Sequence, residues 1–203
     1  ESCPLKWCND THVVVRCAGR EGAGVMKVED IKGETLPRCL NIGTEERPLF
    51  VRVVVHKDTV YDVYNKQSVD AFHVTLAPVM KIMNLLPMPM EYCVCDGAAR
   101  TAPASIEEGE ETRCYDVALT GAEETARVCI KPEGCAEFTA AEASILPAAS
   151  EKSETVETVD ASCRTVRLSY KAIADLNGTI NIQVYCDFWL LNRTGEEIFV
   201  QEK

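Results

Sequence analysis

Eleven cysteines and three histidines are the residues of this sequence best suited to chemistry. The cysteines are Cys3, Cys8, Cys17, Cys39, Cys93, Cys95, Cys114, Cys129, Cys135, Cys163 and Cys186. Zinc sites in sequences are usually marked by two cysteines two residues apart, followed by further Cys or His at matching spacing. No such pair occurs, and His12, His56 and His73 are not spaced to complete a ligand set. The spacing therefore predicts no metal site and no cofactor.

Two interpretations of the cysteines stay open. Reduced cysteine behaves as a small hydrophobic residue and is often buried in intracellular proteins. In a secreted chain the same density would indicate disulfides, although an odd number leaves one thiol over. An extracellular, disulfide-bonded β-sandwich of a surface or adhesion protein is thus the alternative, and the glycosylation sequons at Asn9, Asn177 and Asn192 favour it. Eleven reactive thiols in denaturant would support the first interpretation.

The motifs of common enzyme classes are missing from the sequence. There is no Ser nucleophile elbow, no HExxH pair and no Gly-rich phosphate loop. The net charge of −11 disfavours nucleic acid and anionic lipid surfaces, which select clustered Lys and Arg. No run reaches 18 apolar residues, so direct insertion into a membrane is not expected. These observations predict a non-enzymatic protein that binds other proteins.

The apolar residues follow the pattern of short β-strands. Runs rich in β-branched and aromatic residues occupy residues 11–17, 49–56, 74–83, 166–170 and 178–191, and Gly, Pro or charged residues bound them. Residues 136–149 are alanine-rich and predict a short helix ahead of Pro147. Residues 96–112 and the acidic residues 150–160 predict loops. The fold class expected is all-β.

An internal repeat organises the chain. Residues 74–92 align without a gap with residues 182–200, at an offset of 108 residues. In both copies an apolar strand runs into an asparagine, Asn84 or Asn192, and then into a turn. The repeat predicts stacked β-sandwich units: the C-terminal part of one unit in residues 1–70, one nearly complete unit in 71–180, and the first hairpin of the next in 181–203.

The two repeated asparagines are the candidate site residues. An Asn after a strand can hydrogen-bond the backbone of the following turn and so hold that turn in place. Alternatively, its amide could face the backbone of a bound peptide. The residues alone leave both roles open for Asn84 and Asn192, with the turn-holding role favoured.

The same two segments resemble a known family. Residues 187–195, Asp-Phe-Trp-Leu-Leu-Asn-Arg-Thr-Gly, resemble the opening signature of a repeat in the adaptor-binding domain of the vacuolar protein sorting 13 family. Residues 76–87, Leu-Ala-Pro-Val-Met-Lys-Ile-Met-Asn-Leu-Leu-Pro, resemble a second form of that opening. The order of the segments between them also fits, so the resemblance touches nearly the whole chain.

The resemblance implies a role in lipid transport. Members of that family are large rod-shaped proteins that move lipid between organelles, and their adaptor-binding repeats recruit proteins carrying Pro-x-Pro segments. The chain would then be a cytoplasmic fragment of this array, peripheral at organelle contact sites, that transfers no lipid itself. Its partners would be Pro-x-Pro adaptors and neighbouring repeats of the same chain. Asn84 and Asn192 match the family's recurring asparagine, which matters for repeat integrity or adaptor docking.

Overall fold

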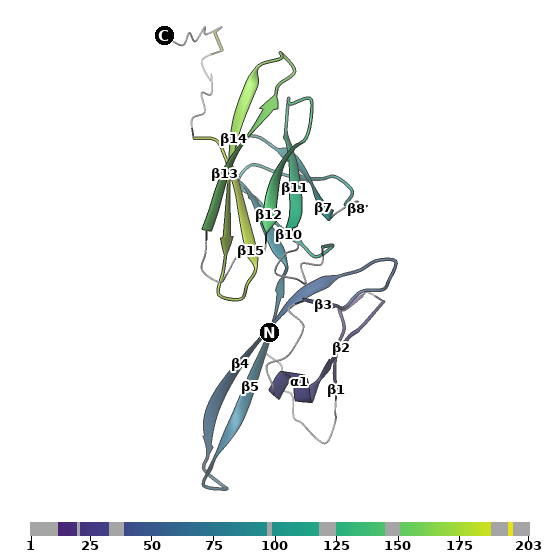
Figure 1. The fold of residues 1–203 in the computed structure, drawn as a ribbon, viewed down its shortest axis with the longest axis vertical. Coiled ribbons are helices and arrows are strands. Elements are labelled where there is room, and N and C mark those ends of the chain that lie inside the picture. The colour runs from purple at the N-terminus through teal and green to yellow at the C-terminus, as the bar shows by residue number, and fades with distance from the viewer. Residues whose placement is uncertain are drawn as a thin grey trace.

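The computed structural model describes residues 12–19, 21–32, 39–96, 99–117, 125–144, 151–187 and 195–196. These residues form strands and one helix of five residues, so the prediction of an all-β chain is confirmed. The elements group into two units that follow one another along the long axis of the molecule (Figure 1).

The first unit has a small core and one long hairpin. Its elements are β1 (His12–Val15), β2 (Gly24–Lys27), α1 (Val28–Lys32), β3 (Cys39–Asn41), β4 (Phe50–Asp62) and β5 (Gln67–Pro78). Strand β1 pairs with β2, and a second sheet has the order β3-β4-β5. The antiparallel register of β4 and β5 runs from Val51 opposite Pro78 to Asp62 opposite Gln67. The far half of this hairpin extends away from the rest of the molecule (Figure 1).

Local sequence explains the hairpin. Strand β4 is dominated by β-branched residues, which suit an extended backbone. At the turn, Asp62 Oδ1 accepts hydrogen bonds from the backbone N–H groups of Tyr64 (2.9 Å) and Asn65 (3.2 Å). Lys66 closes the turn with a positive φ of 55°. An aspartate that caps its own turn in this way stops one strand and starts the next.

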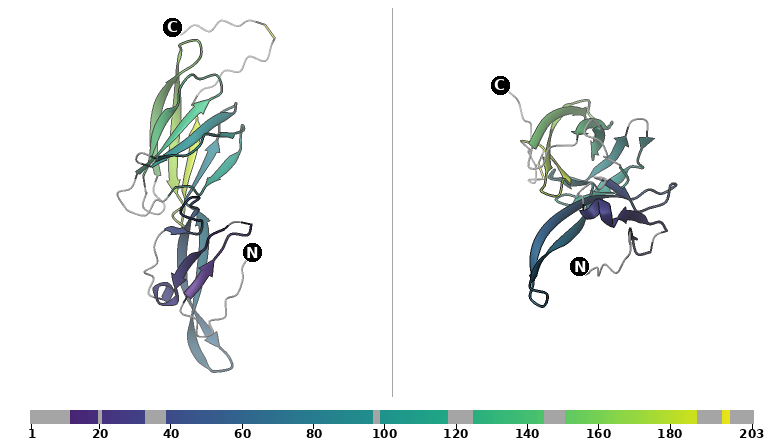
Figure 2. Two further views of the ribbon diagram at one scale, coloured as in Figure 1. Left: turned by 90° about the vertical axis from the view of Figure 1, so that its right-hand side faces the viewer. Right: turned by 60° about the horizontal axis from the view of Figure 1, so that its bottom comes forward.

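The second unit is a β-sandwich. Its strands are β6 (Met80–Asn84), β7 (Met90–Asp96), β8 (Ala99–Arg100), β9 (Ala104–Ile106), β10 (Glu111–Cys114), β11 (Thr125–Pro132), β12 (Thr139–Ser144), β13 (Glu151–Val159), β14 (Thr165–Ala174) and β15 (Ile180–Tyr185). One sheet has the order β10-β6-β15-β14-β13, and the other has the order β12-β11-β7-β8 with β9 also on β7. The two sheets face each other (Figure 2).

The sandwich core lies between these sheets. Strand β15 alternates strictly between buried and half-buried residues, as expected of a strand with one face on a core. Fully buried side chains come from both sheets, among them Ile82, Val128, Ile130, Leu168 and Ile180. Strand β15 pairs with β6 in parallel, from Ile180 opposite Met80 to Val184 opposite Asn84. Residues 100 positions apart in sequence are thus neighbours in one sheet.

The two units are joined through β5 and β6. Only Val79, which is fully buried, separates these strands. Across the junction, Thr179 Oγ1 donates a hydrogen bond to the backbone O of Pro78 (2.9 Å), and the N–H of Phe50 donates to the O of Tyr115 (2.7 Å). The base of the long hairpin is therefore tied to the sandwich at two points.

Three local predictions were wrong. The described part of the alanine-rich segment, residues 136–144, contains β12 rather than a helix, because pairing with β11 outweighs the helix propensity of alanine. The acidic segment 150–160 is mostly β13, the edge strand of its sheet, and the three Glu and one Lys of this strand keep that edge charged. The predicted loop 96–112 contains β8, β9 and the start of β10.

The predicted repeat boundaries after residues 70 and 180 stay predictions. Residues 181–185 of the predicted third unit lie on β15, in the sheet of β6 and β14. Residues 188–194, with Asn192 among them, and residues 197–203 lie outside the described part of the chain.

Candidate functional site

Asn84 ends β6 and is fully buried. Its Nδ2 group donates hydrogen bonds to the backbone oxygens of Met88 (2.8 Å), Ile106 (3.1 Å) and Glu107 (3.1 Å). Its Oδ1 atom accepts a hydrogen bond from the N–H of Leu86 (3.0 Å). One amide thus bonds the turn that follows β6 and the end of β9 at the same time.

The backbone around Asn84 adds to this junction. The N–H of Asn84 donates to the O of Glu110 (2.9 Å), and its O accepts from the N–H of Gly109 (2.9 Å). Gly109 has a positive φ of 75°, which glycine adopts without strain. The N–H of Leu85 donates to the O of Val184 on β15 (2.8 Å). Three segments distant in sequence therefore meet at Asn84.

These bonds bear on the two roles expected for Asn84. Both polar atoms of its side chain are used by the chain's own backbone, and the side chain has no exposed surface. A buried amide with these bonds stabilises the turn, whereas its loss would leave buried carbonyl oxygens without partners. The geometry supports the turn-holding role, which stays a prediction. For Asn192 there is no comparable geometry, since it lies outside the described residues.

The turn held by Asn84 borders a groove. Residues 85–89 join β6 to β7, and they contain the Pro87-Met88-Pro89 sequence. Met88 lines a groove of about 700 Å³, whose other lining residues are Pro132, Glu133, Gly134, Cys135, Asp160, Ala161, Ser162, Arg164, Thr165 and Val166. A smaller hollow of about 290 Å³ shares residues 133–135 with this groove, and its other lining residues are Pro89, Met90, Glu91, Ser105 and Lys131.

The groove combines an apolar floor with a charged rim. Met88, Pro132 and Val166 contribute apolar side chains. On the rim, Asp160 Oδ2 accepts hydrogen bonds from Arg164 at Nε (2.8 Å) and at its terminal guanidinium nitrogen (2.7 Å). The backbone N–H of Arg164, above all, holds the pKa of Asp160 below its ordinary value, with help from the Arg164 guanidinium. An apolar groove with a few oriented polar groups is typical of a binding site.

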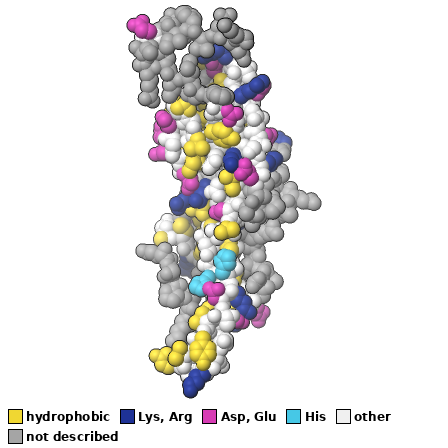
Figure 3. Space-filling model, turned by 90° about the vertical axis from the view of Figure 1, so that its left-hand side faces the viewer, with side chains coloured by type: hydrophobic (Ala, Val, Ile, Leu, Met, Phe, Trp, Pro, Cys, Tyr) yellow, Lys and Arg dark blue, Asp and Glu magenta, His cyan; other side chains and the backbone are white. Residues whose placement is uncertain are grey.

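A second candidate surface is the free end of the β4–β5 hairpin. Apolar side chains gather at this end (Figure 3). The exposed ones on the hairpin are Val60, Tyr61, Val63, Tyr64, Val69 and Leu76, and Tyr64 is 97 % exposed. Tyrosine is enriched at protein interfaces because it offers a large rigid surface with a polar tip. This end of the hairpin is an exposed apolar patch suited to contact with another protein.

Sequence reasoning found Asn84 but missed the groove. The groove is assembled from the turn at residues 132–135, the turn at residues 160–164 and the turn at residues 85–89. Gly134 and the Asp160…Arg164 spacing were the available signals, since both mark tight turns. Nothing in the sequence indicates that these turns meet. Cys93 and Cys95 are two positions apart and so share one face of a strand, but no sequence pattern indicates that Cys129 lies beside them.

The described residues contain no helix long and apolar enough to cross a membrane.

Of two comparisons with known proteins, one found a match. The family model described as "Vacuolar-sorting associated protein 13, adaptor binding domain" matches residues 45–203. This range contains β4 to β15, the asparagine junction and the groove. A search of curated proteins finds no match to the chain.

Proposed function

The chain belongs to the family of adaptor-binding domains of vacuolar-sorting associated protein 13, and from this premise we propose that it docks short Pro-x-Pro segments of adaptor proteins. Membership makes it a protein-binding module. In the proposal, docking recruits the lipid-transfer protein that carries this module to organelle membrane contact sites, where it works from the cytoplasmic side. The module itself performs no catalysis and moves no lipid.

The observation that best supports this proposal is the groove beside the turn held by Asn84. A Pro-x-Pro segment favours the extended polyproline conformation, so it loses little conformational entropy when it binds. Such a segment fits an apolar groove open to solvent, and the floor formed by Met88, Pro132 and Val166 supplies contacts of that kind. Asn84 would act indirectly, by holding Met88 in place through its backbone oxygen.

The charge of the rim suggests which adaptor segments bind best. Glu133 and Asp160 line the groove with a single cation, Arg164, and Arg164 is already paired with Asp160. The whole chain carries a net charge of −11. Complementary charge accelerates association and suppresses wrong partners. Segments with Lys or Arg beside the Pro-x-Pro sequence should therefore bind better than acidic ones.

A peptide titration tests the proposal. Fluorescence anisotropy would follow a labelled Pro-x-Pro peptide with flanking lysines as it binds this chain, and binding to a protein that includes the adjoining repeats would be measured in parallel. Met88→Asp places a charge on the groove floor, and we expect it to weaken binding by about 10-fold or more, as loss of a central interface contact does. Leu85→Asp is the matched control, because Leu85 is 47 % exposed in the same turn and does not line the groove.

Three outcomes would count against groove docking. The peptide could bind neither protein, Met88→Asp and Leu85→Asp could lose the same amount of affinity, or basic and acidic peptides could bind with equal affinity. A pull-down from lysate with Asn84→Ala, compared with the unchanged chain, extends the test to natural adaptors. Selective loss of Pro-x-Pro partners from a folded Asn84→Ala chain is the expected result.

A further inference from the structure

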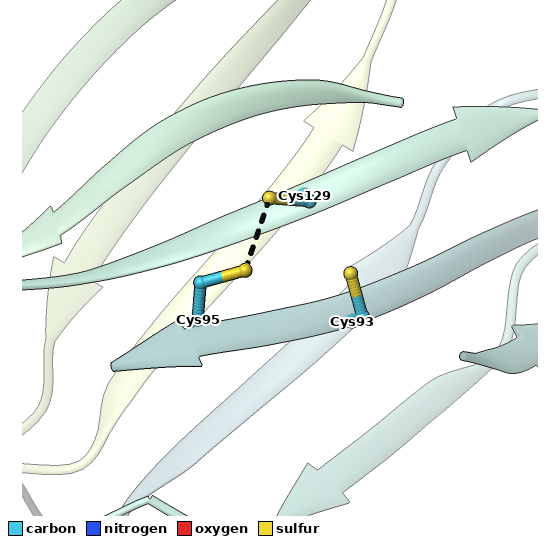
Figure 4. Close-up of side chains that lie close together, drawn as sticks. All are labelled: Cys93, Cys95 and Cys129. Atoms are coloured by element: carbon cyan, nitrogen blue, oxygen red, sulfur yellow. Dashed lines mark hydrogen bonds between the residues drawn. The ribbon is translucent and has the colours of Figure 1, made fainter. Parts of the chain in front are cut away.

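Three cysteine side chains meet on one face of the sandwich. Cys93 and Cys95 lie on β7, and Cys129 lies on the neighbouring strand β11, directly opposite Cys93. Their Sγ atoms all lie within 4.8 Å of one another, and those of Cys95 and Cys129 are 3.5 Å apart (Figure 4). Cys93 is fully buried, whereas Cys95 and Cys129 are half-buried.

These three thiols are not members of the buried cluster between the two sheets. Side chains alternate between the faces of a strand. Val94 and Val128, which are opposite one another in the same strand pair, point into the core between the sheets. The cysteines on either side of these valines must therefore occupy the other face. Cys39 and Cys114, in contrast, are members of the core cluster, so they serve as ordinary small hydrophobic residues.

Cations flank the three thiols. Arg100 Nε donates a hydrogen bond to Cys93 Sγ (3.0 Å). The Arg100 guanidinium lies 4.7 Å from the centre of the Phe138 ring, and Lys131 Nζ lies 5.5 Å from the same ring. Stacking on Phe138 orients the guanidinium beside the sulfur atoms. A fixed positive charge here would stabilise thiolates once they form.

Without a metal ion, Cys129 favours its protonated form. Burial first, and then the neighbouring Cys95, raises the pKa of Cys129 to about 12. Three thiols that crowd one another repel as anions, and this argues against a nucleophilic or catalytic role. A bound metal cation favours the thiolate over the thiol instead, since the cysteines that coordinate it lose their protons.

We propose that Cys93, Cys95 and Cys129 bind one thiophilic d10 metal ion, of the class that contains Zn²⁺ and Cu⁺. Thiolate sulfur is the ligand these ions prefer. With Zn–S bonds of about 2.3 Å, three sulfur atoms of a tetrahedral site lie roughly 3.8 Å apart, so the observed triangle needs shifts of about 1 Å or less. The three S–H protons pass to the solvent as three metal–sulfur bonds form.

The exposed side of the cluster leaves a position open on the ion. Cys95 and Cys129 are half-buried, so water can reach the ion as a fourth ligand to Zn²⁺, whereas Cu⁺ is satisfied by three sulfurs. Three thiolates around Zn²⁺ carry one net negative charge, which Arg100 offsets from 3.0 Å away. Binding ties β7 to β11 within one sheet and leaves the groove at the end of these strands in place.

A metal titration of the whole chain tests the site. The reduced, chelator-treated chain would be titrated with Cd²⁺ in the presence of a phosphine reductant, which keeps the thiols from pairing as a disulfide. Sulfur-to-cadmium charge-transfer absorbance reports thiolate binding, and native mass spectrometry reports the number of ions. We expect one tightly bound ion per chain. Displacement by Zn²⁺ or by Cu⁺ then identifies the preferred member of the class.

Single substitutions locate the ion. Loss of even an outer partner of a metal site weakens binding by about 10- to 100-fold, so Cys95→Ser and Cys129→Ser should each lose at least that factor. Both side chains are half-buried, so the variants should fold, and circular dichroism checks this. The matched control is Cys163→Ser, because Cys163 is exposed in the turn between β13 and β14 of the other sheet and is not one of the three clustered cysteines. Failure of the unchanged chain to bind Cd²⁺, or equal affinity in all these variants, would overturn the proposal.

Discussion

The two units of this molecule bury the apolar faces of their β-sheets to different extents. In the described part of the sandwich, strands from two facing sheets bury one another's apolar faces, and they form one cluster of eighteen buried residues that also includes Cys39 of the first unit. In the first unit, six buried residues form the cluster at the base of the β4–β5 hairpin, and residues 56–61 and 63–70 of that hairpin are exposed almost throughout.

The central strand β15 of the sandwich and the edge strand β5 of the hairpin show a second difference. Strand β15 has a neighbour on both sides, β14 and the parallel strand β6. Strand β5 pairs with β4 on one side, and no described strand pairs with its other side. An open edge strand with the exposed apolar side chains Val69 and Leu76 invites pairing with another chain or with a neighbouring repeat. The comparison indicates that the sandwich supplies the stability of the molecule and that the hairpin supplies a contact surface.

The sharpest test of this comparison removes one apolar side chain from each unit. Leu168→Ala, on the sandwich strand β14, should lower the free energy of unfolding by about 2–5 kcal/mol, because it leaves a cavity in a fully buried position. Val60→Ala, on the hairpin, should change it by no more than about 0.5 kcal/mol, since Val60 is 53 % exposed. Urea denaturation measures both. A large loss for Val60→Ala would show that the hairpin is buried against a partner.

A second test compares two turn asparagines. Asn84→Ala should cost roughly 1–3 kcal/mol, because the backbone oxygens of Met88, Ile106 and Glu107 lose their side-chain donor in a buried site. Asn65→Ala in the hairpin turn removes an exposed bond to Asp62, with an expected cost of about 0.5 kcal/mol or less. Thermal unfolding of the two variants, measured in parallel with the unchanged chain, gives the loss of stability in each. Equal costs would rule out the turn-holding role of Asn84.

A third test concerns the hydroxyl of Tyr170. This group is buried on β14 and has no hydrogen-bond partner in the described part of the chain, and burial raises its pKa. Since a buried polar group without a partner costs stability, Tyr170→Phe should be neutral or stabilising by up to about 1 kcal/mol. Tyr61→Phe on the exposed hairpin is the control, with no change expected. A clear loss in Tyr170→Phe would mean that the hydroxyl bonds a group outside the described residues.

The smallest effect is expected at two turn aspartates, one in each unit. Asp62 is held below its ordinary pKa of 3.8 by the Asn65 side chain first, and Asp160 by the backbone N–H of Arg164 first. A carboxyl with a lowered folded-state pKa stabilises the fold above its unfolded pKa and loses that contribution as the pH falls through its folded value. Carboxyl-carbon NMR between neutral and acidic pH should show both titrating below ordinary aspartates. Either one titrating at or above 3.8 would contradict the turn geometry described for it.

Much of the fold was accessible from local patterns. The runs at residues 11–17, 49–56 and 166–170 overlap β1, β4 and β14, because β-branched side chains favour an extended backbone wherever they cluster. The predictions failed at β12 and β13, whose alanine, Glu and Lys residues have no such preference. There, pairing with β11 and β14 decides the structure. Asn84 was found because a strand, an asparagine and a turn are consecutive in sequence.

By itself, the sequence determined the all-β class, the family and the position of the turn after β6, since each depends on residues close together in the chain. Only the tertiary structure decided that residues 107–110 and β15 converge on Asn84, that three turns enclose a groove, and that Cys129 lies opposite Cys93. These features depend on strand register between distant segments. A shift of one residue would turn each side chain to the opposite face, and no local pattern specifies that register.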